Sequence, residues 1–185
     1  AFGIPIELRH SLSVAQSVVI SRLYGNDQDM IEKVVSGGQT GVDRAALDAA
    51  IEAGIGCGGW CPRGRRAEDG IIPKRYPLKQ TIGSGYFERT RRNVEDANGT
   101  LIVAPGELNG GTLATLNYAQ RIGKPFLIID LAEPNKERHL TGIIEWLHVH
   151  RIKILNVAGP RESGRPGIYD DARDLIARLL VLASS

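Results

Sequence analysis

The spacing of apolar residues along the chain changes repeatedly between two patterns. Short runs rich in Val, Ile and Leu alternate with longer segments in which apolar residues recur every three or four positions. The short runs are typical of buried parallel strands, and the longer segments are typical of amphipathic helices. The predicted strands are residues 33–38, 55–62, 100–105, 125–131 and 152–159, and the predicted helices are residues 43–54, 86–97, 111–123, 136–149 and 168–183.

Strands and helices of these lengths in alternation predict an α/β fold. The expected arrangement is a doubly wound, mainly parallel sheet with helices on both faces. Because the alternation begins near Ile31, we expect one ligand-binding domain over residues 31–185. Residues 1–30 precede it, and we expect them to form a short helix and a polar linker.

Residues 62–86 form an unusually long connection, rich in Gly, Pro and Arg. Connections of this length in a compact domain are usually functional or disordered. The stretch RGRRAEDGIIPKRYP within it is basic, which suits a phosphorylated ligand.

The composition fits a globular domain in the cytoplasm. Hydrophobic residues make up 42% of the 185 residues, enough for a sizeable core. A formal charge of +2 and 5% aromatic residues do not favour a broad nucleic-acid-binding surface. No apolar run approaches the roughly 20 residues of a membrane-spanning helix. The two cysteines, Cys57 and Cys61, are too few for a disulfide framework or a complete zinc site, so we expect a reduced setting.

Glycine-rich loops follow three of the predicted strands, at residues 37–41, 104–112 and 158–163. The carboxyl ends of parallel strands meet at one edge of the sheet, and ligands bind outside that edge. We therefore expect the three loops to form one composite ligand site.

The first loop admits two interpretations. Gly37, Gly38 and Gly41 allow a tight turn against a ligand, and the following helix offers unpaired N–H groups to a phosphate-like anion. Alternatively, Thr40 and Asp43 match a capping box, which is purely structural. The loop lacks the G-x-G-x-x-G fingerprint, and the chain has no Gly-Lys-Ser/Thr, so dinucleotide-dependent hydride transfer and P-loop nucleotide hydrolysis lose their main support.

The other two loops carry similar features. Gly110 and Gly111 precede Thr112, whose hydroxyl either caps a helix or donates to a phosphate. Arg161 is a planar donor suited to phosphate, and Glu162 is an acceptor for an amino-bearing ring edge. The alternative interpretation of the last loop is an exposed turn before the final helix.

The predicted helix 86–97 contains Arg89, Arg91 and Arg92. Acidic residues at i,i+4 spacing from Arg91 and Arg92 predict solvated ion pairs along the helix. We also expect at least one of the three arginines to reach an anionic ligand.

Five stretches occur in order along the chain: SGGQTGVDRAALDAA, GGWCPRGRRAEDGIIPKRYPL, RTRRNVEDANGTLIV, GGT and LNVAGPRES. Together they resemble the molybdenum cofactor carrier family, and the match runs from about Ile31 to Ser185. The resemblance implies a Rossmann-like fold related to the lysine-decarboxylase-like phosphoribohydrolases and to DprA-type DNA-binding proteins. It also implies a homotetramer that binds molybdenum cofactor without known chemistry.

Molybdenum cofactor is a pterin with a terminal phosphate and an oxidised metal held by a dithiolene. The metal arrives with this small anionic ligand, so no protein metal ligand and no catalytic residue is expected. Hand-over of the ligand to molybdoenzymes is the expected partner interaction, and no membrane is involved. The predicted ligand-binding residues are Gly37, Gly38, Gln39, Thr40, Gly41, Asp43, Arg91, Gly110, Gly111, Thr112, Gly159, Arg161, Glu162 and Ser163.

The main alternative is a nucleoside 5′-monophosphate phosphoribohydrolase-like enzyme, or a binder of another phosphorylated nucleotide-like metabolite. The related enzymes resemble P-G-G-x-G-T-x-x-E, and NGGTLATL retains only the Gly-Gly-Thr. Thr115 stands where the glutamate belongs, and Arg91 matches the arginine of that family. Loss of the carboxylate removes the expected acid–base group, which favours a non-catalytic carrier. Glu107, which is nearby in the sequence, is the candidate to replace the missing carboxylate.

Overall fold

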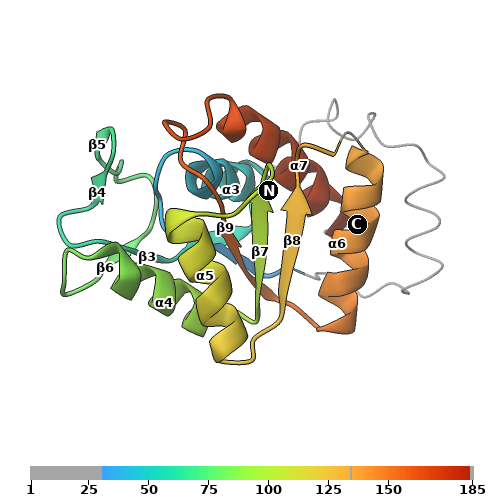
Figure 1. Cartoon of the computed structure of the whole chain (residues 1–185), viewed down its shortest axis with the longest axis horizontal. Coiled ribbons are helices and arrows are strands. Elements are labelled where there is room, and N and C mark those ends of the chain that lie inside the picture. Colours follow the sequence, from blue (N-terminus) through green and yellow to red (C-terminus); the bar gives the residue numbers. More distant parts are fainter. Residues whose placement is uncertain (1–30, 134, 184–185) are drawn as a thin grey trace.

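The computed structural model describes residues 31–133 and 135–183. The helix and linker expected over residues 1–30 lie outside the described residues. Within the described part, five parallel strands form one sheet in the order β2-β1-β9-β7-β8 (Figure 1). The strands are β1 (Lys33–Val35), β2 (Gly56–Gly58), β7 (Gly99–Ala104), β8 (Phe126–Asp130) and β9 (Ile154–Ala158).

Helices cover both faces of this sheet. Helices α3, α6 and α7 pack together on one face, and α4 and α5 pack together on the other (Figure 1). The helices are α3 (Val42–Glu52), α4 (Tyr86–Asp96), α5 (Gly110–Arg121), α6 (Lys136–Val149) and α7 (Ile168–Ala183). The predicted α/β fold, doubly wound and Rossmann-like, is therefore confirmed.

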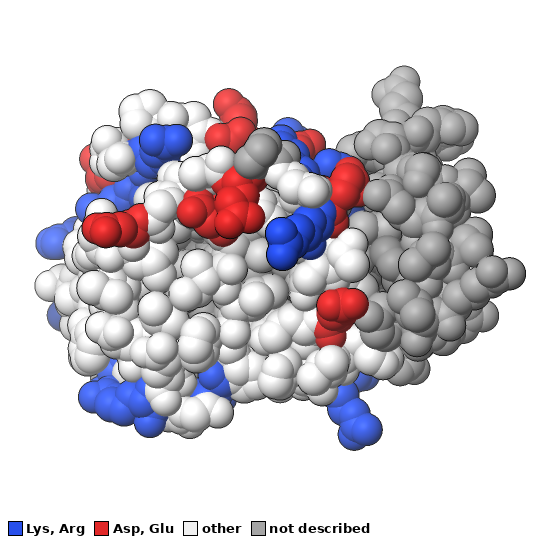
Figure 2. All heavy atoms as spheres, turned by 45° about the vertical axis from the view of Figure 1, so that its right-hand side comes forward, with Lys and Arg blue, Asp and Glu red and all other residues white. Residues whose placement is uncertain are grey.

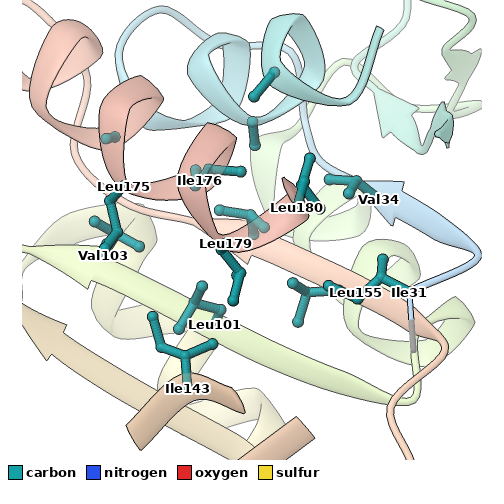
Figure 3. Close-up of a cluster of buried hydrophobic side chains, with 14 of the residues drawn as sticks. Ile31, Val34, Leu101, Val103, Ile143, Leu155, Leu175, Ile176, Leu179 and Leu180 are labelled. Carbon is teal, nitrogen blue, oxygen red and sulfur yellow. The ribbon is translucent and has the colours of Figure 1, made fainter. Parts of the chain in front are cut away.

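The main core lies between the sheet and the α3–α6–α7 layer (Figure 3). In α7, Leu175, Ile176, Leu179 and Leu180 recur at helical spacing, and each is at most 1% exposed. They pack over strand residues such as Leu101, because a helix with one apolar stripe must bury it against another element. Helix α3 contributes the buried small residues Ala45, Ala46, Ala49 and Ala50, which let α7 approach closely.

The predicted strand 55–62 is divided in two at Gly59. Gly59 has φ 127°, and a Cβ there would collide with the backbone oxygen of Ser36. The chain therefore leaves the main sheet after β2. It continues as β3 (Trp60–Cys61), which pairs in parallel with β6 (Lys79–Gln80).

The long connection after β3 is ordered around Arg65. The Arg65 guanidinium donates to the carbonyl oxygens of Ile72, Pro73, Tyr76 and Leu78 at 2.8–3.1 Å. Buried side chains beneath it form a small second core with Leu47 and Cys61. The connection also contains a short antiparallel hairpin, β4 (Arg66–Ala67) with β5 (Gly70–Ile71). We call this pair of strands, with its turn, the β4–β5 hairpin.

The charged side chains of the described residues on the side of β8 and α6 lie mostly above and below an uncharged middle, with most acidic groups in the upper half (Figure 2). Figure 2 shows acidic and basic side chains mainly toward the margins of that face, with a broad uncharged middle among the described residues. Exposed apolar side chains on the elements of this side include Leu113 and Ile128. None of the described helices is long and apolar enough to span a membrane.

Candidate functional site

The loops after β1 and β9 are in direct contact at the carboxyl edge of the sheet. Their strands are neighbours, and the Val42 N–H donates to the Pro160 oxygen at 3.3 Å. Gly41 has φ 75°, and a Cβ on it would lie 2.5 Å from the same Pro160 oxygen. A side chain at position 41 would therefore force the two loops apart. The structure thus brings the predicted stretches 37–41 and 158–163 together.

Helix α3 does not begin with the predicted capping box. Its N-cap is Gly41, and no side chain caps it. The Asp43 carboxylate instead accepts the Gln39 N–H at 3.2 Å, and the Gln39 side-chain oxygen accepts the Thr40 N–H at 3.1 Å. The capping-box interpretation is wrong because left-handed Gly41 starts the helix one residue later, which frees the Thr40 hydroxyl for other partners.

A buried ion pair lies beneath the first loop. Arg89 Nη1 is 2.8 Å from Asp43 Oδ2, and the two side chains are 12% and 9% exposed. Burial raises the pKa of the Asp43 carboxyl, while Arg89 and the Gln39 N–H oppose that rise. The Arg89 guanidinium covers Gly37, since a Cβ at Gly37 would collide with it. Arg89 therefore fills the space that the glycine leaves open.

A small polar cavity of about 20 Å³ adjoins this pair. Its lining includes Asp43, Arg89, Asn93, Thr115 and Asn156. Such a volume holds about one water molecule.

Arg91 lies away from these loops. Its guanidinium donates to Glu95 and to the Tyr118 hydroxyl, each at 3.3 Å, and its side chain is 47% exposed. Positions 89 and 91 flank buried Thr90, each rotated by about 100° around the helix axis. Arg89 is on the side that faces the β1 loop, and Arg91 is on the side that faces α5. Arg92 pairs with Glu88 at 3.8 Å.

The loop after β7 is at the same edge but is fastened toward β8. The Gly106 N–H donates to Asp130 Oδ1 at 2.9 Å. Gly110 and Gly111 open α5 and are exposed, and a Cβ on either would meet no atom within 4 Å. Thr112 is buried in the first turn, and the N-cap is Asn109, so Thr112 is not the cap.

The loop after β9 is anchored by Glu162, and its Arg161 side chain packs on the Tyr86 ring of α4. The Glu162 carboxylate accepts the N–H groups of Gly167 at 2.5 Å and Tyr169 at 3.0 Å, which fixes the loop to the start of α7. Arg161 lies 4.9 Å from the centre of the Tyr86 ring. At the base of the loop, a Cβ on Gly159 would collide with the β7 backbone.

Glu68 on the β4–β5 hairpin joins the two loops, and nothing in the sequence pattern predicted it. Its carboxylate accepts the Thr40 hydroxyl, the Ser163 N–H at 3.1 Å and the Ser163 hydroxyl at 2.5 Å. Desolvation raises the pKa of Glu68, but the hydrogen bonds from Ser163 and Thr40 and the charge of Arg161 outweigh it and hold that pKa below its usual value. A lone acidic residue in an aperiodic hairpin gives no signal of such a contact.

The described residues contain no group of three or more His, Cys, Asp or Glu side chains placed to hold a metal ion. Cys57 and Cys61 are free thiols, and burial raises the pKa of both. At the loop edge itself, the polar groups of Thr40, Ser163 and Arg161 are hydroxyl, amide and guanidinium donors, which are of the kinds that bind anions.

The family follows from a sequence comparison. A family model described as the circularly permutated YpsA SLOG family, cpYpsA, matches residues 34–180. The chain belongs to the cpYpsA family. In this cpYpsA protein the matched span runs from β1 into α7, so it includes all three glycine-rich loops.

A solved structure gives a second comparison. The cpYpsA protein is 45% identical to a chain from Syntrophus aciditrophicus SB described as "Putative molybdenum carrier protein", with a TM-score of 0.81. The match covers 84% of this chain and 98% of that one. The resemblance to molybdenum carriers that the sequence indicated is confirmed. No match was found among curated proteins.

Proposed function

We propose that this cpYpsA protein binds molybdenum cofactor and holds it as a carrier or store, without transforming it. The observation that carries the proposal is the 45% identity over 98% of a chain described as a molybdenum carrier. The homotetramer, the cytoplasmic location and the hand-over to molybdoenzymes belong to the same proposal.

The carboxyl edge supports an anionic ligand. Donors of three kinds gather where the β1 and β9 loops meet: the Thr40 hydroxyl, the N–H and hydroxyl of Ser163, and the Arg161 guanidinium beside them. Such groups suit the phosphate or the oxometalate end of the cofactor. The Tyr86 ring, which Arg161 contacts 4.9 Å from its centre, provides an aromatic face for the pterin once the guanidinium moves to the anionic end of the ligand. The metal is part of the cargo, so the protein needs no ligands of its own for it.

The arginine that we assign to the ligand on α4 is Arg89. Arg91 belongs to the predicted set, but it faces Glu95 and Tyr118 on the other side of the helix. Arg89 lies at Gly37 and also 5.9 Å from the Tyr86 ring centre. The remaining predicted glycines shape the backbone of the loops.

The phosphoribohydrolase alternative has weaker support. Thr115 is buried and donates to the Gly111 oxygen at 2.9 Å. The carboxylate of the adjoining cavity is Asp43, which is engaged by Arg89. These contacts favour binding over glycosidic cleavage.

The test is the cofactor content of the full chain purified from a host that makes molybdenum cofactor. Bound molybdenum is measured by mass spectrometry and released pterin by fluorescence after oxidation. We expect near-equal amounts of both in the wild type and a clear loss of both in Arg161→Ala. Arg92→Ala removes an exposed arginine from α4 and serves as the matched control with unchanged loading.

Metal without pterin would reduce the proposal to simple oxyanion binding. If neither metal nor pterin is found, even after free cofactor is offered to the purified protein, the carrier proposal is wrong. Nucleoside monophosphates would then be the next ligands to screen.

A further inference from the structure

The Glu68 carboxylate is bound in the way that a small oxyanion would be bound. One oxygen accepts the Thr40 hydroxyl and the Ser163 N–H, and the other accepts the Ser163 hydroxyl. Thr40 follows β1 and Ser163 follows β9, so donors from two loops far apart in sequence converge on one anion. The anion comes from a third segment, the β4–β5 hairpin.

The hydroxyl of Thr40 is oriented as a donor. It accepts the Glu162 N–H at 3.3 Å, which directs its own hydrogen toward Glu68. Arg161 contributes a positive charge to the same place. The side chain of Gln39 is 4% exposed, and its Nε2 has no acceptor among the described residues. The junction therefore combines hydroxyl and N–H donors with the positive charge of Arg161, which is the chemistry of an oxyanion subsite.

Glu68 can leave this subsite without moving the hairpin. Its backbone N–H is held by Gln39 Oε1 at 2.9 Å. The next residue, Asp69, accepts two hydrogen bonds from Arg44, at 2.5 and 2.7 Å. The Glu68 side chain itself is exposed, so rotation about its side-chain bonds moves the carboxylate into solvent. Release then breaks only the contacts to Thr40 and Ser163.

We infer that Glu68 is an intramolecular competitor that occupies an oxyanion subsite formed by Thr40 and Ser163 until the anionic end of a ligand displaces it. The inference rests on the proposed function only in that the ligand carries a phosphate or an oxometalate. With such a competitor, the apparent affinity equals the intrinsic affinity multiplied by the fraction of molecules in which the subsite is free. Free phosphate, with no further contacts, is thereby rejected, while a larger ligand that also contacts the rest of the edge retains its binding.

The test is calorimetric titration of the full chain with inorganic sulfate, a dianion whose charge is constant near neutral pH. We expect Glu68→Ala and Glu68→Gln to bind sulfate about tenfold more tightly than the wild type. Glu145→Gln, at an exposed position of α6, changes the net charge equally and is expected to bind like the wild type. In the Glu68→Ala background, adding Thr40→Val and Ser163→Ala is expected to return the affinity to the wild-type level or below.

Equal affinity of Glu68→Ala and the wild type would overturn the inference, and so would weaker binding, which would make Glu68 a ligand contact or a structural support. A thermal melt of each variant identifies any loss of folding. Cofactor loading separates the two proposals. If Glu68→Ala binds sulfate more tightly but the wild type carries no cofactor, the competitor role of Glu68 stands and the carrier function is wrong. If the wild type carries cofactor but Glu68→Ala does not change the sulfate affinity, the carrier function stands and the competitor role is wrong.

Discussion

Arg89 Nη1 and Asp43 Oδ2, 2.8 Å apart, join a helix on one face of the sheet to the start of a helix on the other. The pair passes over Gly37, at the carboxyl ends of β1 and β9. Both side chains are largely buried, so each charge depends on the other for compensation. Removing one partner of such a pair costs far more than the intact pair contributes.

Arg89→Met is expected to lower the free energy of unfolding by about 3 kcal/mol at neutral pH. Burial already raises the pKa of Asp43 above 3.8, and without Arg89 the pKa rises further. A carboxyl with a raised folded-state pKa favours folding below its unfolded-state pKa and loses that contribution as the pH rises through the folded-state value. The deficit of the variant should therefore be small near pH 4 and grow toward pH 8, by urea denaturation.

The matched control is the double variant Arg89→Met/Asp43→Asn, which has no carboxyl to titrate at this place. Its deficit relative to the wild type should depend much less on pH. A pH-independent deficit in Arg89→Met itself would show that Asp43 is not the group left uncompensated.

Gly41→Ala and Gly54→Ala separate backbone strain from contact between loops. Both glycines have positive φ, 75° and 70°, but only a Cβ at Gly41 would lie against Pro160, whereas one at Gly54 would meet no atom within 4 Å. We expect Gly54→Ala to cost about 1 kcal/mol and Gly41→Ala about 2 kcal/mol more. Chemical denaturation measures both, and equal costs would remove the argument for close loop contact.

Arg65→Lys is expected to loosen the long connection after β3. A lysine cannot reach the four carbonyl oxygens that the planar guanidinium of Arg65 joins, which we expect to cost about 2 kcal/mol. Limited trypsin digestion should then cut first at Arg66, Lys74 or Arg75. Arg63→Lys, at an exposed position of the same connection, is the control, and equal resistance of both variants would contradict the role of Arg65.

Tyr169 is expected to lose its phenolic proton at a higher pH than an ordinary tyrosine. Burial, together with its hydrogen bond to Asp48 at 2.8 Å, raises the pKa of Tyr169 to about 12. Its contribution to folding is therefore complete below pH 10 and is lost as the pH rises through about 12. Tyrosinate absorbance compared between the wild type and Tyr169→Phe measures the shift, and Asp48→Asn should reduce it. An early, unshifted Tyr169 would exclude the Asp48 contact.

The sequence pattern predicted the order and type of the main elements because each has a strong apolar period. Helices α6 and α7 begin and end at the predicted residues. Helix α6 also has a local signal at its start, since the side chain of Asn135 accepts the Arg138 N–H at 3.0 Å. The sequence did not predict the break between strands at Gly59. Its positive φ and its missing Cβ are required by the nearby backbone of Ser36, which is distant in the sequence.

The site was harder to predict, for two physical reasons. Arg89 and Arg91 are related nearly symmetrically about buried Thr90, so periodicity alone does not tell which one turns to the loops. Glu68 reaches its partners through a hairpin whose docking depends on Gln39 and on the Arg44–Asp69 ion pair, and neither contact leaves a periodic trace. Parallel topology, by contrast, sufficed to place the glycine-rich loops at one edge.

The anchoring of the two contacting loops has a consequence for binding kinetics. Glu162 fixes the β9 loop to α7, the β1 loop runs directly into α3, and these two helices pack together. The entropy of ordering both loops is therefore lost during folding, before a ligand arrives. Association at a preorganised edge of this kind requires no coupled folding of the loops, so its heat-capacity change should reflect only the surface that the ligand and the edge bury against each other.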